Sequence, residues 1–160
     1  MSTVTVRRAT QADLATLAAN EPRPELSLGQ RRFDEMTSGS GIFAVAEVDG
    51  QLAASGFLDF EDEDLQPEVK NLWVFPEFRR HGAGHALWTW LEEQAREAGH
   101  KEVFLSVAPD NAGAIGLFLN LGYAPTGDHT IIDNPAAHVV ADPDQISTHY
   151  AIYSKSLLAY

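Results

Sequence analysis

The most constraining stretch of this sequence runs from Val69 to Gly122 and begins as a strand, a glycine-containing loop and a helix. The apolar run over residues 69–75 is typical of a strand, and Pro76 ends it because proline cannot donate to a sheet ladder. Arg79-Arg80-His81-Gly82-Ala83-Gly84 follows, and then a predicted helix from His85 to Ala98. Glycines permit a tight turn with inward N–H groups, and a helix N-terminus carries about half a positive charge. This order of elements predicts a site for a phosphate or pyrophosphate.

Two common phosphate-binding loops do not fit this segment. A P-loop needs Lys and then Ser or Thr after its last glycine, whereas His85 and Ala86 follow Gly84. The dinucleotide fingerprint needs a third glycine at the position of Leu87. A different kind of loop is therefore required.

The segment instead resembles the acyl-coenzyme A signature of the GNAT superfamily of N-acetyltransferases, R/Q-x-x-G-x-G/A between a strand and a helix. The family's downstream pattern, Asn-x-x-Ala-Ile-x-Leu-Tyr-x-x-x-Gly-Phe/Tyr, also has counterparts in this chain. They are Asn111, Ala114, Ile115, Leu117, Phe118, Gly122 and Tyr123. The resemblance covers residues 3–160 by element order and Leu72–Tyr123 by specific motif.

The resemblance implies an α/β fold with a mixed sheet, in a single domain over residues 1–160. This GNAT fold has about seven strands and four helices. Its fourth and fifth strands, here Val69–Phe75 and Glu102–Val107, start parallel and then splay apart beside a bulge in the fourth. The pantetheine arm of the cofactor lies in that gap. The other expected elements are strands Thr3–Arg8, Ile42–Val48, Leu52–Phe60, Tyr123–Ile132 and His149–Leu157, a helix after Thr10, a helix over Glu25–Met36 and a short helix before Leu121.

Acetyl-CoA is the implied co-substrate, with no metal. The backbone N–H groups of Arg80–Ala86 are expected to hold the pyrophosphate, and Arg79 and Arg80 add charge for the phosphates. A fourth-strand N–H near Trp73–Val74 is expected to polarise the thioester oxygen. Asn111 either reaches the pantetheine or caps a helix. The full predicted cofactor set is Leu72, Trp73, Val74, Arg79, Arg80, His81, Gly82, Ala83, Gly84, His85, Ala86, Asn111 and Phe118.

Acetyl transfer to an amine needs a general base, because an amine with a pKa of about 10 arrives as an ammonium ion. Some family members place a glutamate on or just before the fourth strand, which makes Glu68 the first candidate; a plain surface carboxylate is the alternative. On a regular strand residues 68, 70, 72 and 74 share one face. The reserve candidates are Asp59, Glu61 and Tyr150.

The sequence departs from the family at position 118, where a tyrosine commonly protonates the departing thiolate and Phe118 stands here. A thiol with a pKa near 8.5 leaves tolerably without an acid, or another group replaces it. The candidate replacements are Ser106, Tyr123, Tyr150 and water. The alternative is a non-catalytic acyl-CoA-binding or sensor module.

Net charge restricts the partners. Eleven Lys and Arg residues against 23 Asp and Glu residues give a net charge of −12, which argues against nucleic acid and an anionic membrane as partners. The charge favours a cationic small-molecule or peptide amine through steering, although solubility explains it equally well. The acidic connector Glu61-Asp62-Glu63-Asp64 is either a solvated loop tip or part of the amine entrance, and residues 133–145 are expected to form a loop.

The remaining features indicate a cytoplasmic protein without a metal site. There are no cysteines, the first residues lack the apolar core of a signal peptide, and no apolar run approaches 18 residues. His129, Asp133 and His138 match no zinc spacing. A homodimer is left open beside a monomer.

Overall fold

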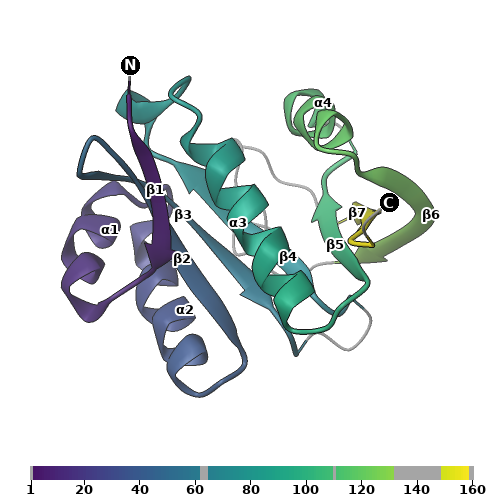
Figure 1. Ribbon diagram of the computed structural model, residues 1–160, viewed down its shortest axis with the longest axis horizontal. Helices are drawn as coiled ribbons and strands as arrows, with labels where there is room; N and C mark the ends of the chain where they lie inside the picture. The colour runs from purple at the N-terminus through teal and green to yellow at the C-terminus, as the bar shows by residue number, and fades with distance from the viewer. Residues whose placement is uncertain (1, 62–64, 110, 132–148, 159–160) are drawn as a thin grey trace.

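Seven strands form one mixed sheet, and four α-helices cover its two faces, within the residues that the structure describes (Figure 1). The computed structural model describes residues 2–61, 65–109, 111–131 and 149–158. The elements are β1 Val4–Arg8, α1 Leu14–Asn20, α2 Leu28–Thr37, β2 Gly41–Val48, β3 Gln51–Asp59, β4 Glu68–Val74, α3 Ala83–Glu97, β5 Glu102–Val107, α4 Ala112–Asn120, β6 Ala124–Ile131 and β7 His149–Ser156. The predicted α/β fold and element order are confirmed. The acidic residues 62–64 and the expected loop 133–145 lie outside the described residues.

The sheet has the strand order β1-β2-β3-β4-β5-β7-β6. Strands β1 to β4 are antiparallel neighbours, and the β2–β3 hairpin turns at Asp49 and Gly50, whose φ angles are 50° and 83°. Two successive positive φ angles characterise a type I′ turn, the geometry that an Asp-Gly pair favours between strands. This local pattern therefore sets the hairpin.

Strands β4 and β5 are parallel and touch only where they begin. Glu68 and Phe104 are the one pair in register between them, whereas β5 continues along β7 through six pairs from Glu102↔Ser156 to Val107↔Ala151. Beyond that first pair the two strands diverge, which confirms the expected splay. Among the described residues, one edge of β4 is thereby left without a strand partner in the middle of the sheet.

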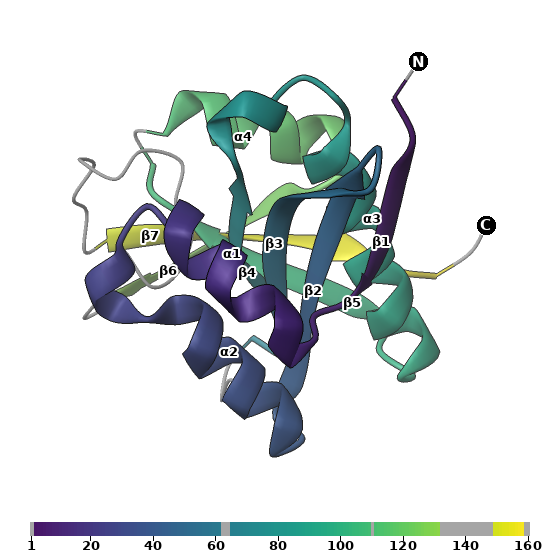
Figure 2. The same ribbon diagram turned by 90° about the vertical axis from the view of Figure 1, so that its left-hand side faces the viewer.

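The two faces of the sheet carry separate apolar clusters. Helices α1 and α2 pack on one face, where Leu17 lies with Phe43, Val45 and Phe57. Helix α3 packs on the other face through Leu87, Trp88, Leu91 and Ala95, and α4 adds Phe118 to the same cluster. Figure 2 shows α1 and α2 together on one side of the strands and α3 on the other. The splayed strands thus lie between two firmly packed layers.

Two predicted helix starts were wrong by two or three residues. Helix α2 begins at Leu28 rather than Glu25, because residues 24–26 form a 3₁₀ turn and Ser27 takes a left-handed φ of 50°. Helix α3 begins at Ala83 rather than His85, because Gly82, with φ 82°, serves as its N-cap. The second shift places a glycine of the loop directly at the helix end.

Candidate functional site

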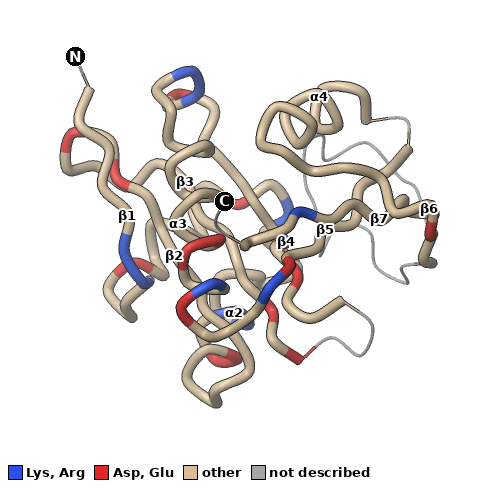
Figure 3. The backbone as a smooth tube through the Cα atoms, turned by 45° about the vertical axis from the view of Figure 1, so that its right-hand side comes forward, with Lys and Arg blue, Asp and Glu red and all other residues tan. Residues whose placement is uncertain are grey.

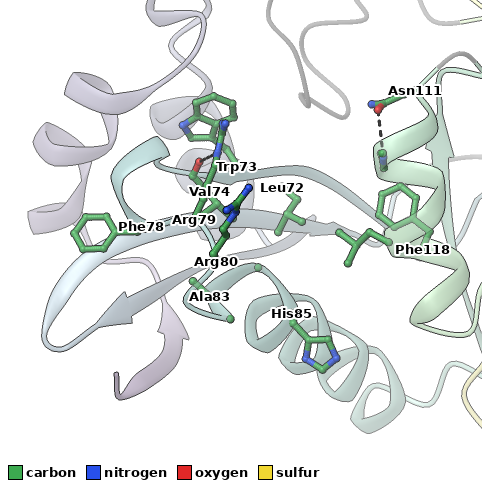
Figure 4. Close-up of a pocket in the computed structure, with 15 residues that line it drawn as sticks. Leu72, Trp73, Val74, Phe78, Arg79, Arg80, Ala83, His85, Asn111 and Phe118 are labelled. Atoms are coloured by element: carbon green, nitrogen blue, oxygen red, sulfur yellow. Dashed lines mark hydrogen bonds between the residues drawn. The ribbon is translucent and has the colours of Figure 1, made fainter. Parts of the chain in front are cut away.

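A groove of about 840 Å³ opens beside the start of α3, between β4 and α4 (Figure 4). Volumes of this size are typical of pockets that enclose a large organic ligand. Every residue predicted to bind the cofactor lines it, except His81 and Ala86. The lining also includes four residues that the sequence patterns did not single out for binding: Phe78, Gly113, Ala114 and Leu117.

One end of the groove has the backbone geometry typical of an anion-binding site. Arg80 and Gly82 take positive φ angles of 69° and 82°, and α3 begins immediately afterwards. Left-handed residues at a turn before a helix direct successive N–H groups into one concavity. The N–H groups of Ala83, Gly84 and His85 belong to the first helical turn and have no acceptor within the helix.

The expected run of phosphate-facing N–H groups, Arg80–Ala86, is one residue too long. The N–H of Ala86 donates to the carbonyl of Gly82 at 3.0 Å, as the first regular bond of the helix. His81 is exposed, and its Nδ1 lies 3.1 Å from the hydroxyl of Ser2. The anion concavity therefore ends at His85.

The groove is basic although the chain is acidic. Arg79, Arg80 and His85 line it, and none of the fifteen described lining residues is an aspartate or glutamate. Elsewhere acidic residues are spread over many elements (Figure 3). Arg79 is held in place, since its guanidinium lies 5.1 Å from the centre of the Trp73 ring and its Nε donates to the carbonyl of Val74 at 3.3 Å. Local charge thus favours an anionic ligand against the net charge of the molecule.

The β4 wall of the groove contains a bulge. Between β3 and β4 the register steps from Ser55↔Trp73 to Phe57↔Lys70, and Asn71 takes a φ of 58°. The predicted shared face of residues 68, 70, 72 and 74 was wrong, because the extra residue reverses the alternation. Leu72 and Val74 pack toward α3, whereas Trp73 donates its Nε1 to the carbonyl of Asn20 on the α1 side.

The bulge leaves a backbone donor facing the gap between the strands. The N–H of Phe75 donates to the carbonyl of Ala53 on β3 at 2.8 Å. Neighbouring residues of a strand point their N–H groups to opposite edges, so the N–H of Val74 faces the edge toward β5. In the part of the chain that the structure describes, no strand pairs with that edge at this level. The donor is therefore available to a ligand lying in the gap.

The opposite wall of the groove comes from α4. Asn111 is the N-cap of this helix, and its side-chain oxygen accepts the N–H of Ala114 at 3.2 Å. Asn111 also lines the groove, so the capping role and a ligand contact are compatible. Phe118 is buried, with its ring centre 4.9 Å from that of Trp88.

Tyr123, one of the predicted substitutes for the missing acid, is committed to a buried network. Its hydroxyl accepts from Trp88 Nε1 at 2.8 Å and donates to Glu92 at 2.6 Å, while Lys155 also contacts Glu92 at 3.1 Å. Burial, reinforced by the Glu92 carboxylate, raises the pKa of Tyr123 well above its ordinary value. This hydroxyl holds α3 against the segment between α4 and β6, and it is a poor proton donor for a ligand.

The predicted catalytic carboxylate, Glu68, lies where β4 and β5 part. It is 0% exposed, which rules out the alternative of a surface carboxylate, and Ser106 of β5 donates to it at 3.0 Å. Tyr150 is buried on β7 beside Ala108. Neither Glu68 nor Tyr150 is among the residues that line the two cavities described here. Of the reserve candidates, Asp59 pairs with Lys70 at 2.7 Å.

A carboxylate that sequence reasoning missed lies on the other side of Trp73. A small cavity of about 20 Å³, enough for one water molecule, is lined by Glu21, Arg32, Ser55 and Asn71, with Trp73 shared between it and the groove. The remaining lining residues are Pro22, Leu28, Gly29 and Phe43. Burial raises the pKa of Glu21 above its ordinary value, although the N–H of Gly29 at 2.6 Å favours the charged form. Glu21 follows a helix in the sequence, and no local pattern distinguishes it.

Among the described residues no three His, Asp or Glu side chains are grouped to hold a metal ion. His129 and His149 do form a pair, with ring nitrogens 2.9 Å apart on neighbouring strands. Asp133 and His138 lie outside the described residues. Within the described part of the chain no helix is both long and apolar enough to cross a membrane.

Comparison with known proteins gives a family model and several relatives. Residues 9–123 match the model of the "Acetyltransferase (GNAT) family". An acetyltransferase of Pectobacterium atrosepticum is 32% identical over 82 residues, which cover 51% of this chain and 57% of that protein. An uncharacterised N-acetyltransferase of Lactobacillus delbrueckii subsp. lactis is 25% identical over 104 residues, 61% of this chain. The match spans 60% of that protein's length, so the chain covers less than two thirds of either relative.

Solved structures show the same fold. A Salmonella typhimurium protein, described as a putative acetyltransferase with its cofactor acetyl-CoA, superposes with a TM-score of 0.72. The superposition covers 99% of this chain and 96% of that one at 18% identity. At this identity the likeness concerns the fold, including the arrangement of sheet and helices around the groove.

Proposed function

Because the chain belongs to the GNAT acetyltransferase family, we propose that it moves an acetyl group from acetyl-CoA to a primary amine by direct attack while both are bound. The observation that carries this proposal is the basic groove, free of acidic residues in its described lining, that runs from the start of α3 to α4 along the part of β4 that is not paired with β5. A pyrophosphate and a thioester at the two ends of one pantetheine arm match these two features.

The residues present fit acetyl-CoA. The N–H groups of Ala83, Gly84 and His85 are proposed to bind the pyrophosphate, with Arg79 and Arg80 nearby. A Cβ added at Gly84 would lie 3.2 Å from Val74, so a glycine lets α3 approach β4 closely here. Leu72, Ala114, Leu117 and Phe118 offer apolar walls for the pantetheine arm. The thioester supplies the activated acyl carbon.

The N–H of Val74 is proposed to stabilise the developing charge on the thioester oxygen. The ammonium first gives a proton to a base. The freed amine then forms the new C–N bond as the C–S bond breaks, and the nitrogen loses its second proton to solvent. Preorganised donors of this kind are worth on the order of 3 kcal/mol each to the transition state. The departing thiolate takes a proton from water or a neighbouring hydroxyl, since Phe118 has none to give.

The acceptor is proposed to be a cationic small-molecule or peptide amine, in keeping with the net charge of −12. Glu68, together with Ser106, is proposed as the base because it lies at the point where the strands diverge. Tyr150 on β7 is proposed as a supporting hydroxyl. Glu21 is the competing carboxylate, since it adjoins the groove through Trp73.

Two matched substitutions separate the candidate bases. Glu68→Gln keeps an oxygen to accept from Ser106, and we expect it to lower kcat by about 100-fold and to abolish the acidic limb of the pH–rate profile. Glu21→Gln keeps an acceptor for Gly29 and is the control, expected to change kcat little. The reverse pattern would assign the base to Glu21.

Release of free CoA thiol, measured across a panel of mono-, di- and polyamines and short peptides, tests the activity itself. Thiol release that depends on the amine, with an acetylated product of the expected mass, is the predicted result. Tight binding of acetyl-CoA without turnover across the panel would instead identify a non-catalytic acyl-CoA-binding module. The substitution of phenylalanine for the family's tyrosine at position 118 is the observation that keeps this second function in view.

A further inference from the structure

Asn71 is the residue at which β4 departs from regular strand geometry. Its φ angle of 58° lies in the left-handed region, and its side chain is buried. A left-handed conformation is unfavourable for any residue that carries a Cβ, although asparagine tolerates it better than most. Such a conformation persists where the surrounding contacts determine it. The contacts of Asn71 therefore decide whether β4 keeps its bulge.

Arg32 of α2 donates a hydrogen bond to Asn71. Its Nε donates to Oδ1 of Asn71 at 2.7 Å, and the arginine is only 6% exposed. Its Nη1 lies 2.9 Å from each carboxylate oxygen of Glu35, and its guanidinium carbon lies 5.0 Å from the ring centre of Phe57 on β3. The guanidinium is thus positioned by α2 and β3 together, and it presents a fixed donor to the bulge.

The bulge determines which N–H of β4 faces the gap. Beyond it, Phe75 bonds to β3 and Val74 turns toward β5, where the carbonyl of Val74 also accepts from Arg79. Without the extra residue the alternation would shift by one, and the donor at that position would point to β3 instead. The direction of the proposed oxyanion donor, the N–H of Val74, therefore depends on the conformation of Asn71.

We propose that Arg32 is a positioning residue for acetyl transfer, which holds the β4 bulge through Asn71 and so directs the N–H of Val74 at the thioester oxygen. This inference rests on the proposed function, because it needs a thioester in the gap. Arg32 is not among the residues that line the groove, whose phosphate end is formed by residues 79–85. It is proposed to act through β4.

The simpler interpretation is that Arg32 only stabilises the layer between α2 and the sheet. Both interpretations expect the variants to unfold more easily. They differ in what happens to the folded protein. A purely stabilising residue leaves the Val74 donor unchanged in the molecules that remain folded, whereas a positioning residue changes that donor and leaves CoA binding at α3 intact.

The first test observes Val74 directly and does not require turnover. The amide proton of Val74 is followed by NMR in protein saturated with CoA and then with acetyl-CoA, so that the difference reports the acetyl carbonyl. In the wild type we expect a downfield shift on replacing CoA by acetyl-CoA. In Arg32→Lys and Asn71→Ala we expect this shift to shrink or vanish, with the Kd for CoA within about threefold of wild type, because the phosphate contacts are untouched.

The second test splits kcat from KM. At a temperature where each variant is fully folded, Arg32→Lys and Asn71→Ala are expected to lower kcat by about 10- to 100-fold with little change in KM for acetyl-CoA. Asn71→Gly adopts a positive φ without strain but lacks the link to Arg32, so its kcat should lie between those of wild type and Asn71→Ala. If Arg32→Lys fails to fold, both the NMR shift of Val74 and the kinetic constants are measured on Asn71→Gly instead. Arg31→Lys, an exposed neighbour, is the control and should match the wild type.

The outcomes separate the two proposals. An unchanged Val74 shift difference in the variants, or a wild-type Val74 amide that does not respond to the acetyl group, overturns the role of Arg32. A proportional loss of kcat and CoA affinity also overturns it. A wild-type protein that acetylates no amine but shows the Val74 response, lost in the variants, would refute catalysis and leave the positioning role standing.

Discussion

At the residue scale, two left-handed residues lie on either side of the β4 wall of the groove. Arg80, with φ 69°, shapes the anion concavity before α3, and Asn71, with φ 58°, forms the bulge. Each conformation is unfavourable by itself, and each is paired with a feature that a ligand would use. Positive charge at the start of α3 likewise opposes the helix dipole unless an anion binds there.

Gly82→Glu is the sharpest single-residue test of the phosphate end. The substitution places a Cβ and a carboxylate at φ 82° beside the free N–H groups, and we expect acetyl-CoA affinity to fall by at least about 100-fold because like charges repel. Isothermal titration calorimetry measures the change.

Gly99→Glu provides the matched control for that substitution. Gly99 lies just after the other end of α3, its φ is 94°, and an added Cβ meets nothing within 4 Å, as at Gly82. The variant should lose comparable stability and keep wild-type affinity. Equal affinity in both variants would refute the phosphate assignment.

Phe118→Tyr tests the departure from the family pattern. The ring already packs in the groove wall, so acetyl-CoA affinity should stay close to that of the wild type. We expect kcat to rise several-fold, short of the roughly 100-fold typical of a general acid, because a thiolate leaves tolerably unaided. An unchanged kcat in stopped-flow thiol assays would mean that another group already protonates the thiolate.

At the element scale, ionic contacts tie β1 to the first helical segment. Arg7 on β1 reaches both oxygens of Asp13 at 2.8 and 2.9 Å, and the N–H of Thr10 donates to the same carboxylate at 2.7 Å. The Arg7 hydrogen bonds, aided by Thr10 and opposed by burial, lower the pKa of Asp13 from 3.8 to about 2. The predicted acid three residues after the cap therefore serves two elements.

This depressed pKa predicts a stability loss in acid. A carboxylate with a lower pKa in the folded state stabilises the fold above its unfolded pKa, and the contribution disappears as the pH falls from about 4 to 2. Asp13→Asn should lower the free energy of unfolding by about 1–2 kcal/mol at pH 7. The difference in unfolding free energy between this variant and the wild type should become smaller as the pH falls from about 4 to 2. Urea denaturation at several pH values measures it, with exposed Glu97→Gln as control; a difference that stays constant with pH would contradict the assignment.

At the scale of the whole molecule, a net charge of −12 surrounds a basic groove. The same field that attracts a cationic acceptor opposes the approach of an anionic cofactor, so the local arginines have to outweigh it. Added salt weakens mainly the long-range electrostatic interaction between the net charge and an approaching ligand, because the Debye length falls from about 10 Å at 0.1 M to about 3 Å at 1 M.

Steering predicts a salt dependence that differs between acceptors. At saturating acetyl-CoA, kcat/KM for a polyamine should fall more steeply with added NaCl than kcat/KM for a monoamine of similar size, since more charge is attracted. Initial rates over a salt series measure both slopes. Parallel slopes would mean that the negative charge serves solubility alone.

Local patterns were sufficient for the elements and for the donor side of the site. The Asp49-Gly50 turn, the helix stripes and the glycine loop are each specified over a few residues, and the family resemblance added the fold and most of the groove lining. The resemblance implied a bulge in β4 but not its position, so the faces of the β4 residues were predicted wrongly. The bulge lies at Asn71, which Arg32 contacts from 39 residues away in the sequence. Glu21 could not be identified from the sequence either, because its neighbours in the small cavity come from α2 and β4, which are far apart in the sequence.

The sequence by itself thus determined where strands, helices and an anion-binding turn would form, because hydrophobic period, glycine conformation and helix ends are short-range effects. Only the tertiary structure decided that β4 and β5 part after a single pair, that Glu68 is buried at that point, and that Tyr123 is bonded to Glu92. Those outcomes depend on which distant side chains come within hydrogen-bonding distance, and packing of the two helical layers against the sheet sets that proximity.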